Sequence, residues 1–144
     1  MTNTSATFTV RRFKSVDRDA VRALWLRVFP DDPPWNAPDL IIASKLKVQP
    51  DLFFVGEVGG QVVGALVAGF DGMRGWLYHL AVAPEHRRCG FATELVHTAE
   101  QALRGLGCAK VNLQVRAENA AVVAFYRSVG YQAEERVSMG HRLA

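Results

Sequence analysis

The segment from Pro84 to Ala92 (PEHRRCGFA) separates an apolar run at residues 77–83 from an amphipathic stretch that begins at about Phe91. The apolar run is typical of a buried strand, and the pattern after it predicts a helix. A loop at the start of a helix presents several main-chain N–H groups without partners, and the helix dipole adds positive potential there. The order strand, glycine-containing basic loop and helix therefore predicts an α/β protein with a site for a phosphate or pyrophosphate.

The first third of the chain predicts a strand followed by a helix. Residues Phe8–Phe13 alternate apolar and polar side chains, as a half-buried strand does. Ser15 or Asp17 can cap the helix that follows. Its apolar residues fall at i, i+3, i+4 and i+7 and share one face, which predicts a core contact for Val21, Leu24, Trp25 and Val28.

The stretch 30–38 contains four prolines, which excludes a regular helix or strand there. A second helix is expected from Pro38 to about Val48. Its apolar positions are Leu40, Ile41, Ile42 and Leu46.

Turn signals divide the rest of the chain. Gly59–Gly60 indicates a hairpin between strands at 52–58 and 61–70, and a second turn at 71–75 precedes a strand at 76–83. Later elements are a helix from about 91 to 105, a strand at 110–116, a helix from 119 to 129, and two strands at 131–135 and 137–143. A helix connects strands 76–83 and 110–116, so these two should be parallel.

We therefore expect one α/β domain over residues 1–144 with the order β-α-α-β-β-β-α-β-α-β-β. Helices would flank a mixed, mostly antiparallel sheet of about seven strands. Hydrophobic residues make up 49% and charged residues 22%, which is typical of a soluble globular protein. Neither a signal peptide nor an apolar run of membrane-spanning length is visible, which predicts a cytoplasmic protein without membrane contact.

Charge and cysteine content narrow the possible partners. The net charge of +3 is mild, and no long basic stripe indicates nucleic acid binding. Cys89 and Cys108 do not form a disulfide framework. His86 and Cys89 stand at a spacing that metal pairs use, but no second pair follows, so we expect no metal site.

Two patterns connect the chain with one family. Arg87-x-x-Gly90-x-Ala92 fits neither the P-loop nor the Gly-x-Gly-x-x-Gly motif. It resembles the Arg/Gln-x-x-Gly-x-Gly/Ala pyrophosphate loop of the GNAT N-acetyltransferases, which bind acetyl-CoA. A second stretch is similar to the other signature of that family: Asn119-x-x-Val122-x-x-Phe125-Tyr126-x-x-x-Gly130-Tyr131. Segments 34–38, 69–75 and 138–143 further resemble the YpeA-type bacterial acetyltransferases.

The resemblance implies the GNAT fold, in which two central parallel strands splay apart at the acetyl-CoA site. The main chain at Leu80, Ala81 and Val82 would pair with the pantetheine arm of acetyl-CoA. Gly90 would let the main chain approach the phosphates without a Cβ in the way. Thr93 would add a hydroxyl, and Asn119 would cap its helix and contact the cofactor. The N–H groups that would hold the pyrophosphate belong to Arg87, Arg88, Cys89, Gly90, Phe91 and Ala92.

The resemblance further implies catalytic roles. Tyr126 corresponds to the tyrosine that serves many relatives as general acid near the cofactor sulfur. Some relatives carry a glutamate base where this chain has Gln114, which cannot take a proton. His79 and Tyr78, expected on opposite faces of one strand, are the local substitutes, and His79 has a suitable unperturbed pKa of about 6.5. Glu57, Asp71, Glu118 or a water molecule are the alternatives.

In relatives the segment between the two early helices covers the acceptor cleft, so the resemblance implies that the acceptor amine binds there. Trp35 and Asn36 lie there, and Asp31 with Asp32 could attract a cationic amine or simply form a solvated turn. The preferred interpretation is an enzyme that transfers acetyl from acetyl-CoA to an unidentified primary amine by direct attack. The alternative is an acyl-CoA-binding module without catalysis, which Gln114 favours. Relatives are often homodimers, so a homodimer is possible.

Overall fold

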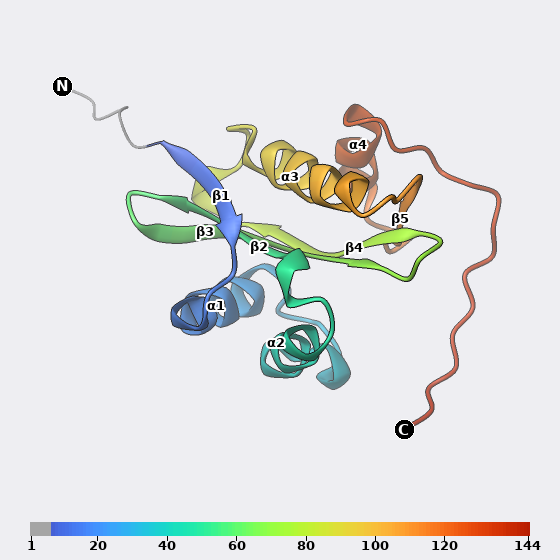
Figure 1. Ribbon diagram of the computed structural model, residues 1–144, viewed down its shortest axis with the longest axis horizontal. Helices are drawn as coiled ribbons and strands as arrows, with labels where there is room; N and C mark the ends of the chain where they lie inside the picture. Colours follow the sequence, from blue (N-terminus) through green and yellow to red (C-terminus); the bar gives the residue numbers. More distant parts are fainter. Residues whose placement is uncertain (1–6) are drawn as a thin grey trace. The chain divides into compact units, whose positions relative to one another are not determined.

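A computed structural model describes residues 7–144 of the chain (Figure 1). These residues form two compact units, one up to Leu113 and the other Gln114–Ala144. The first unit is built on a five-stranded sheet in the order β1-β2-β3-β4-β5. Neighbours β1 to β4 pair antiparallel, whereas β4 and β5 pair parallel. The strands are β1 (Phe8–Arg12), β2 (Phe53–Val58), β3 (Gln61–Phe70), β4 (Gly75–Val82) and β5 (Val111–Leu113). The expected antiparallel succession and the parallel pair are confirmed.

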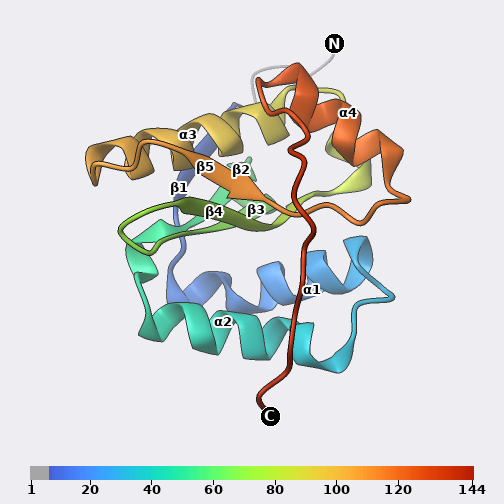
Figure 2. The ribbon, with the colours of Figure 1, turned by 90° about the vertical axis from the view of Figure 1, so that its right-hand side faces the viewer.

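Helices cover both faces of this sheet. Helices α1 (Arg18–Val28) and α2 (Pro38–Lys47) lie on one face, and α3 (Phe91–Gly105) lies on the other (Figures 1 and 2). Short 3-10 turns occupy Ser15–Asp17, Pro34–Asn36, Pro50–Leu52 and Pro84–His86. The turn at Pro34–Asn36 lies inside the stretch in which we expected no helical structure, because a single 3-10 turn tolerates proline at its first position.

The core forms where α1 and α3 press apolar side chains on the sheet. Val21, Leu24 and Trp25 of α1 are buried as their spacing predicts, whereas Val28, expected on the same face, is only half-buried. The Trp25 ring stacks on Phe53 of β2, with centroids 5.8 Å apart. On the opposite face, Leu95, Val96, Ala99 and Leu103 of α3 are fully buried.

Helix α2 differs from the prediction. Leu40 is 54% exposed and Leu46 is 39% exposed, whereas Ile42 and Lys45 are buried. Two residues three positions apart share a helix face, so the face that α2 turns inward carries one apolar and one cationic side chain. The sequence pattern missed this because Leu40, Ile41, Ile42 and Leu46 do not lie on one face.

The two last strands expected from the sequence, at 131–135 and 137–143, do not form. The second unit contains helix α4 (Ala120–Ser128), and the residues after it follow an irregular path. Almost all side chains from Gln132 onward are exposed, so this segment buries no apolar face that would favour pairing. The sheet has five strands instead of about seven, and β5 is an edge strand.

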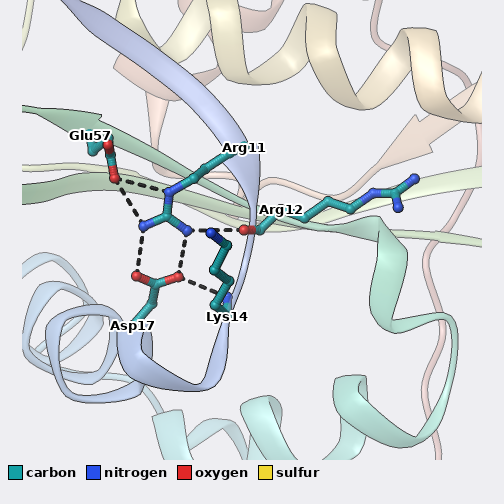
Figure 3. A network of polar contacts seen from close by, with 5 residues as sticks. All are labelled: Arg11, Arg12, Lys14, Asp17 and Glu57. Atoms are coloured by element: carbon teal, nitrogen blue, oxygen red, sulfur yellow. Dashed lines mark hydrogen bonds and ion pairs between the residues drawn. The ribbon is translucent and has the colours of Figure 1, made fainter. Parts of the chain in front are cut away.

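A cluster of charged residues connects the turn before α1 with strands β1 and β2 of the sheet (Figure 3). The Arg11 guanidinium donates two hydrogen bonds of 2.8 Å to the Asp17 carboxylate and one of 2.9 Å to Glu57. Asp17 Oδ2 also accepts from the Lys14 N–H at 2.8 Å. Asp17 therefore fixes the turn before α1 through its carboxylate, and Arg11 holds the pKa of that carboxyl below its ordinary value.

Strand β4 carries a β-bulge. Ala65 pairs with Ala81 and Val67 pairs with Tyr78, so β4 has one residue more than β3 between these two pairs. His79 sits in the extra stretch with φ +54°, a left-handed conformation that is uncommon for a residue other than glycine. The indole N–H of Trp25 donates to the His79 carbonyl at 3.0 Å and fixes the bulge to α1.

Two further observations concern residues 7–144. No helix in this part of the chain is long and apolar enough to cross a membrane. The same residues contain no group of three or more His, Cys, Asp or Glu side chains placed to hold a metal ion.

Candidate active site

The segment between β4 and α3 leaves a run of main-chain N–H groups unbonded. Among the hydrogen bonds of the described residues, none is donated by the N–H groups from Arg88 to Thr93. The helical ladder begins only with the bond from the Glu94 N–H to the Gly90 carbonyl, at 3.1 Å. These N–H groups lie at the positive end of the α3 dipole, and an anion could satisfy several of them at once.

The backbone conformation of this loop suits an anion. Arg87 is extended, Arg88 has φ +63° and Gly90 has φ +80°. Left-handed residues in a turn are typical of main-chain nests, in which successive N–H groups line a concavity that binds an anion. A Cβ added at Gly90 would meet no atom within 4 Å, so the space next to it is open. The residues present therefore fit a pyrophosphate.

Neighbouring side chains fix the loop. Arg27, the last but one residue of α1, forms two hydrogen bonds of 2.7 and 3.1 Å to Glu85 in the 3-10 turn. The Phe91 ring stacks on Phe8 of β1 with centroids 3.9 Å apart. Arg87, Arg88 and Cys89 are exposed, and the Cys89 thiol contacts the Arg87 carbonyl at 3.5 Å.

The second half of β4 is free of a strand on its outer edge. β5 pairs only with Gly75, Trp76 and Leu77. Leu80, Ala81 and Val82 continue past this pairing, and Ala81 and Val82 are held by β3 on the other edge alone. The outer edge of Leu80–Val82 therefore has main-chain groups that an added extended ligand could pair with.

His79 points to the face covered by α1. Its ring makes edge contacts with Trp25 at 5.2 Å and with Phe29 at 5.6 Å. Among the described residues Nε2 has no hydrogen-bond partner of good geometry, although the Asp32 carboxylate lies 3.5 Å away. Burial lowers the pKa of His79 below its ordinary value, against the opposing effect of Asp32, so His79 is a neutral imidazole near pH 7.

Tyr78 lies on the same face of the sheet as His79, not the opposite one. A Cβ added at Gly69 would be 4.0 Å from the Tyr78 ring and 4.0 Å from Nζ of Lys45, a residue of α2. The expected alternation fails because the bulge inserts a residue after Tyr78. Tyr78, His79, Asp32 and Lys45 are thus gathered on the face covered by α1 and α2. The sequence pattern did not single out Lys45, whose only signal is its spacing of three from Ile42.

The second unit holds the other expected catalytic residue. Tyr126 is 8% exposed, its ring makes edge contacts with Phe125 and Tyr131, and burial raises its pKa to about 12. Asn119 caps α4, since its side-chain oxygen accepts from the Val122 N–H at 3.3 Å. The Gln114 amide donates to the Ser138 hydroxyl.

The remaining candidates have structural partners. Glu57 is bound by Arg11, and the Asp71 carboxylate accepts from the N–H groups of Met73 and Arg74 at 2.8 Å. Trp35 is 51% exposed in the turn between α1 and α2, and Asn36 follows it. Glu57 and Asp71 are therefore poorly placed to accept a proton from a substrate.

Comparison with known proteins gives consistent similarities. The sequence profile of the acetyltransferase (GNAT) family matches residues 18–131. A protein named acetyltransferase from Pectobacterium atrosepticum is 40% identical over 136 residues, covering 93% of this chain and 94% of its own. One from Sodalis glossinidius is 42% identical over 137 residues with the same coverage. The solved structure of an aminoglycoside N-acetyltransferase, AAC(6')-Iy with CoA, has a TM-score of 0.80 at 18% identity and covers 100% of both chains, which is a likeness of fold.

Proposed function

This chain belongs to the acetyltransferase (GNAT) family, and on that premise we propose that it moves the acetyl group of acetyl-CoA to a primary amine by direct attack. The observation that carries the proposal is the run of unbonded N–H groups from Arg88 to Thr93 at the start of α3, beside the free edge of β4. These N–H groups would hold the pyrophosphate of acetyl-CoA. The main chain at Leu80–Val82 would hold its pantetheine arm.

Transfer requires two proton movements. The amide C–N bond forms as the thioester C–S bond breaks, the amine loses a proton and the departing thiolate gains one. We assign the first movement to His79, because its imidazole is neutral near pH 7 and lies beside Asp32. We assign the second to Tyr126, because its raised pKa keeps the phenol protonated and able to donate.

The acceptor site is assigned to the face covered by α1 and α2. Tyr78 and His79 come from β4, and Trp35 and Asn36 come from the turn that leads into α2. Gln114 stands where some relatives carry a glutamate base and cannot accept a proton, so the proposal takes the base from β4.

An assay of free thiol tests the proposal. Acetyl-CoA is incubated with a panel of amines, and thiol release is compared with the mass of the acetylated amine. We expect the two to appear in equal amounts for at least one amine class. Thermal stabilisation by CoA without turnover on any amine would instead favour a binding module.

A pair of glycine variants tests the loop. Gly90 and Gly60 both have φ +80°, and an added Cβ at either meets nothing within 4 Å. Gly90→Ala and Gly60→Ala should each destabilise the fold by about 1–2 kcal/mol, the cost of a left-handed alanine. Only Gly90→Ala should raise the KM for acetyl-CoA, by roughly tenfold or more, because a methyl group at the loop disturbs bonds to a charged ligand. Equal KM values in both variants would contradict a pyrophosphate site at this loop.

A further inference from the structure

Lys45 is a buried cation that the proposed reaction does not use. Its side chain lies on the inward face of α2 and the residue is 9% exposed. In the part of the chain that the structure describes, no carboxylate pairs with its ammonium group and no hydrogen bond satisfies it. Burial alone lowers its pKa, with no contribution from an acidic neighbour. Lys45 Nζ is not among the fully buried atoms of the described residues that lack a partner, so the stem of the side chain is buried while the ammonium remains accessible to an anionic ligand.

Lys45 Nζ lies opposite a glycine of β3. A Cβ added at Gly69 would lie 4.0 Å from Lys45 Nζ, 4.0 Å from Tyr78 Cε2 and 3.8 Å from Gln49 Oε1, all ordinary contact distances. The φ of Gly69 is not in the left-handed region, so the backbone does not require glycine here. Several groups therefore converge on one point of β3 from which a side chain is missing.

The groups around Gly69 differ in whether their hydrogen-bonding atoms are free to bind a ligand. The Gln49 amide is used by the backbone of Phe70, donating to its carbonyl and accepting from its N–H at 2.9 Å each. Tyr78 has a pKa raised by burial and by Asp71, so its phenol stays protonated, and Cε2 adjoins the carbon that bears the hydroxyl. Lys45 and Tyr78 thus provide one positive charge and one hydroxyl donor.

Tyr78 also connects Lys45 with the proposed reaction centre. His79 follows it directly in β4, and the Asp32 carboxylate lies 3.5 Å from His79 Nε2. The negative charge of Asp32 is therefore placed beside His79, and the positive charge of Lys45 is placed near Tyr78, the residue before it. Such an arrangement complements a small molecule that carries an amine and an acid.

We propose that Lys45 and Tyr78, which approach each other beside Gly69, bind a carboxylate of the acceptor, so that the acceptor is an amine that also carries a carboxylate, such as an amino acid. This proposal rests on the proposed acetyl transfer for its amine end. A single ammonium with one hydroxyl matches a singly charged carboxylate. A phosphate group usually takes several N–H donors or an arginine fork, and the contacts described around Lys45 include neither.

Pairs of acceptors test the proposal. Free amino acids are each compared with their carboxamides, which keep the amine and remove the negative charge. The wild type should show a kcat/KM for the acids that is roughly ten- to hundredfold higher, the range for a hydrogen bond to a charged group. Equal or higher values for the carboxamides would overturn the carboxylate site and leave acetyl transfer intact.

Variants test whether the preference for acids depends on the charge of Lys45 and not on the stability of the fold. Lys45→Met keeps the length of the side chain and suits a buried position, and it should raise the KM for the acids while leaving the carboxamides unchanged. Lys47→Met, on the exposed end of α2, is the control and should keep the preference. Gly69→Val places a side chain that strands accept between Lys45 and Tyr78, and it should also raise the KM for the acids. If Lys45→Met and Gly69→Val both retain the preference, the assignment is wrong.

A binding measurement distinguishes the failure of this proposal from that of the proposed function. N-acetylated amino acids should raise the melting temperature of the wild type but not of Lys45→Met, and N-acetylated carboxamides should raise neither. If no amine is acetylated but this stabilisation occurs, the carboxylate site stands and the transfer is refuted. If the acids stabilise the wild type no better than the carboxamides, the carboxylate site is refuted.

Discussion

Tyr126 is the residue that we hold responsible for protonating the leaving thiolate. Tyr126→Phe should lower kcat by roughly 10²- to 10⁴-fold, the usual contribution of a general acid, while the affinity for CoA stays near that of the wild type. The phenyl ring preserves the edge contacts with Phe125 and Tyr131, so the fold should persist. Steady-state kinetics together with CoA titration check this, and a fully active Tyr126→Phe enzyme would remove the assignment.

His79 should determine the acid limb of the pH profile. A base must be neutral, and burial lowers the pKa of His79 below 6.5. The kcat/KM should therefore fall as the pH decreases through the lowered pKa, whereas Tyr126 stays protonated until the pH approaches about 12. In His79→Gln, both most of the turnover and this inflection should disappear. An unchanged acid limb in that variant would show that another group titrates.

The sequence predicted the strand β4 but not where two of its side chains point. Tyr78 and His79 were placed on opposite faces by strict alternation, and one inserted residue brings them to the same face. A bulge at a histidine leaves no pattern in the sequence, because it depends on the contact between Trp25 and the His79 carbonyl. Lys45 was missed because a hydrophobic pattern gives no weight to a buried charge.

At the scale of elements, the cluster around Arg11 joins β1, β2 and the turn before α1. Asp17→Asn removes the charge that Arg11 meets with two hydrogen bonds, and we expect a loss of about 2–4 kcal/mol in the free energy of unfolding. The control is the exposed pair of Arg12 and Asp51, 3.7 Å apart. Asp51→Asn should change the stability by less than about 0.5 kcal/mol. Denaturant unfolding of both variants checks this, and equal losses would contradict it.

The same cluster predicts the direction of an acid effect. The pKa of Asp17 in the fold is lower than its ordinary 3.8, so the ionised form stabilises the native state. This contribution is complete above that ordinary value and is lost as the pH falls below it toward the lowered one. Asp17→Asn should therefore lose less stability than the wild type between pH 5 and pH 2. If the free energies of unfolding of the wild type and of Asp17→Asn fell by equal amounts over that pH range, the prediction would be wrong.

Most elements could be predicted from local patterns, and the failures have physical causes. Strand and helix limits around the loop at 84–92 follow from glycine, proline and periodicity, and the start of α3 at Phe91 is confirmed. The strands expected at 131–135 and 137–143 do not form, because a local pattern shows only that a segment could pair. Whether it does depends on a partner edge and a buried face, which no short pattern contains.

For the whole molecule, the charge predicts how acetyl-CoA binding depends on salt. The net charge is +3, and Arg87 and Arg88 are exposed at the loop proposed to hold the pyrophosphate. Added salt screens attraction between such exposed charges, so the KM for acetyl-CoA should rise with NaCl between 0.01 and 1 M, where the Debye length falls from about 30 to 3 Å. Replacing both arginines with glutamine should flatten this dependence. A salt-independent KM in the wild type would exclude a role for these charges.

The bulge in β4 makes the orientation of the site depend on the number of residues and not only on their kinds. Every side chain after the insertion is shifted to the other side of the sheet relative to an unbroken strand. A homologue that had lost one residue here could keep tyrosine, histidine and lysine and still present the imidazole to α3. Comparison of related enzymes by residue identity alone would then assign them the same chemistry, although one of them could not perform it.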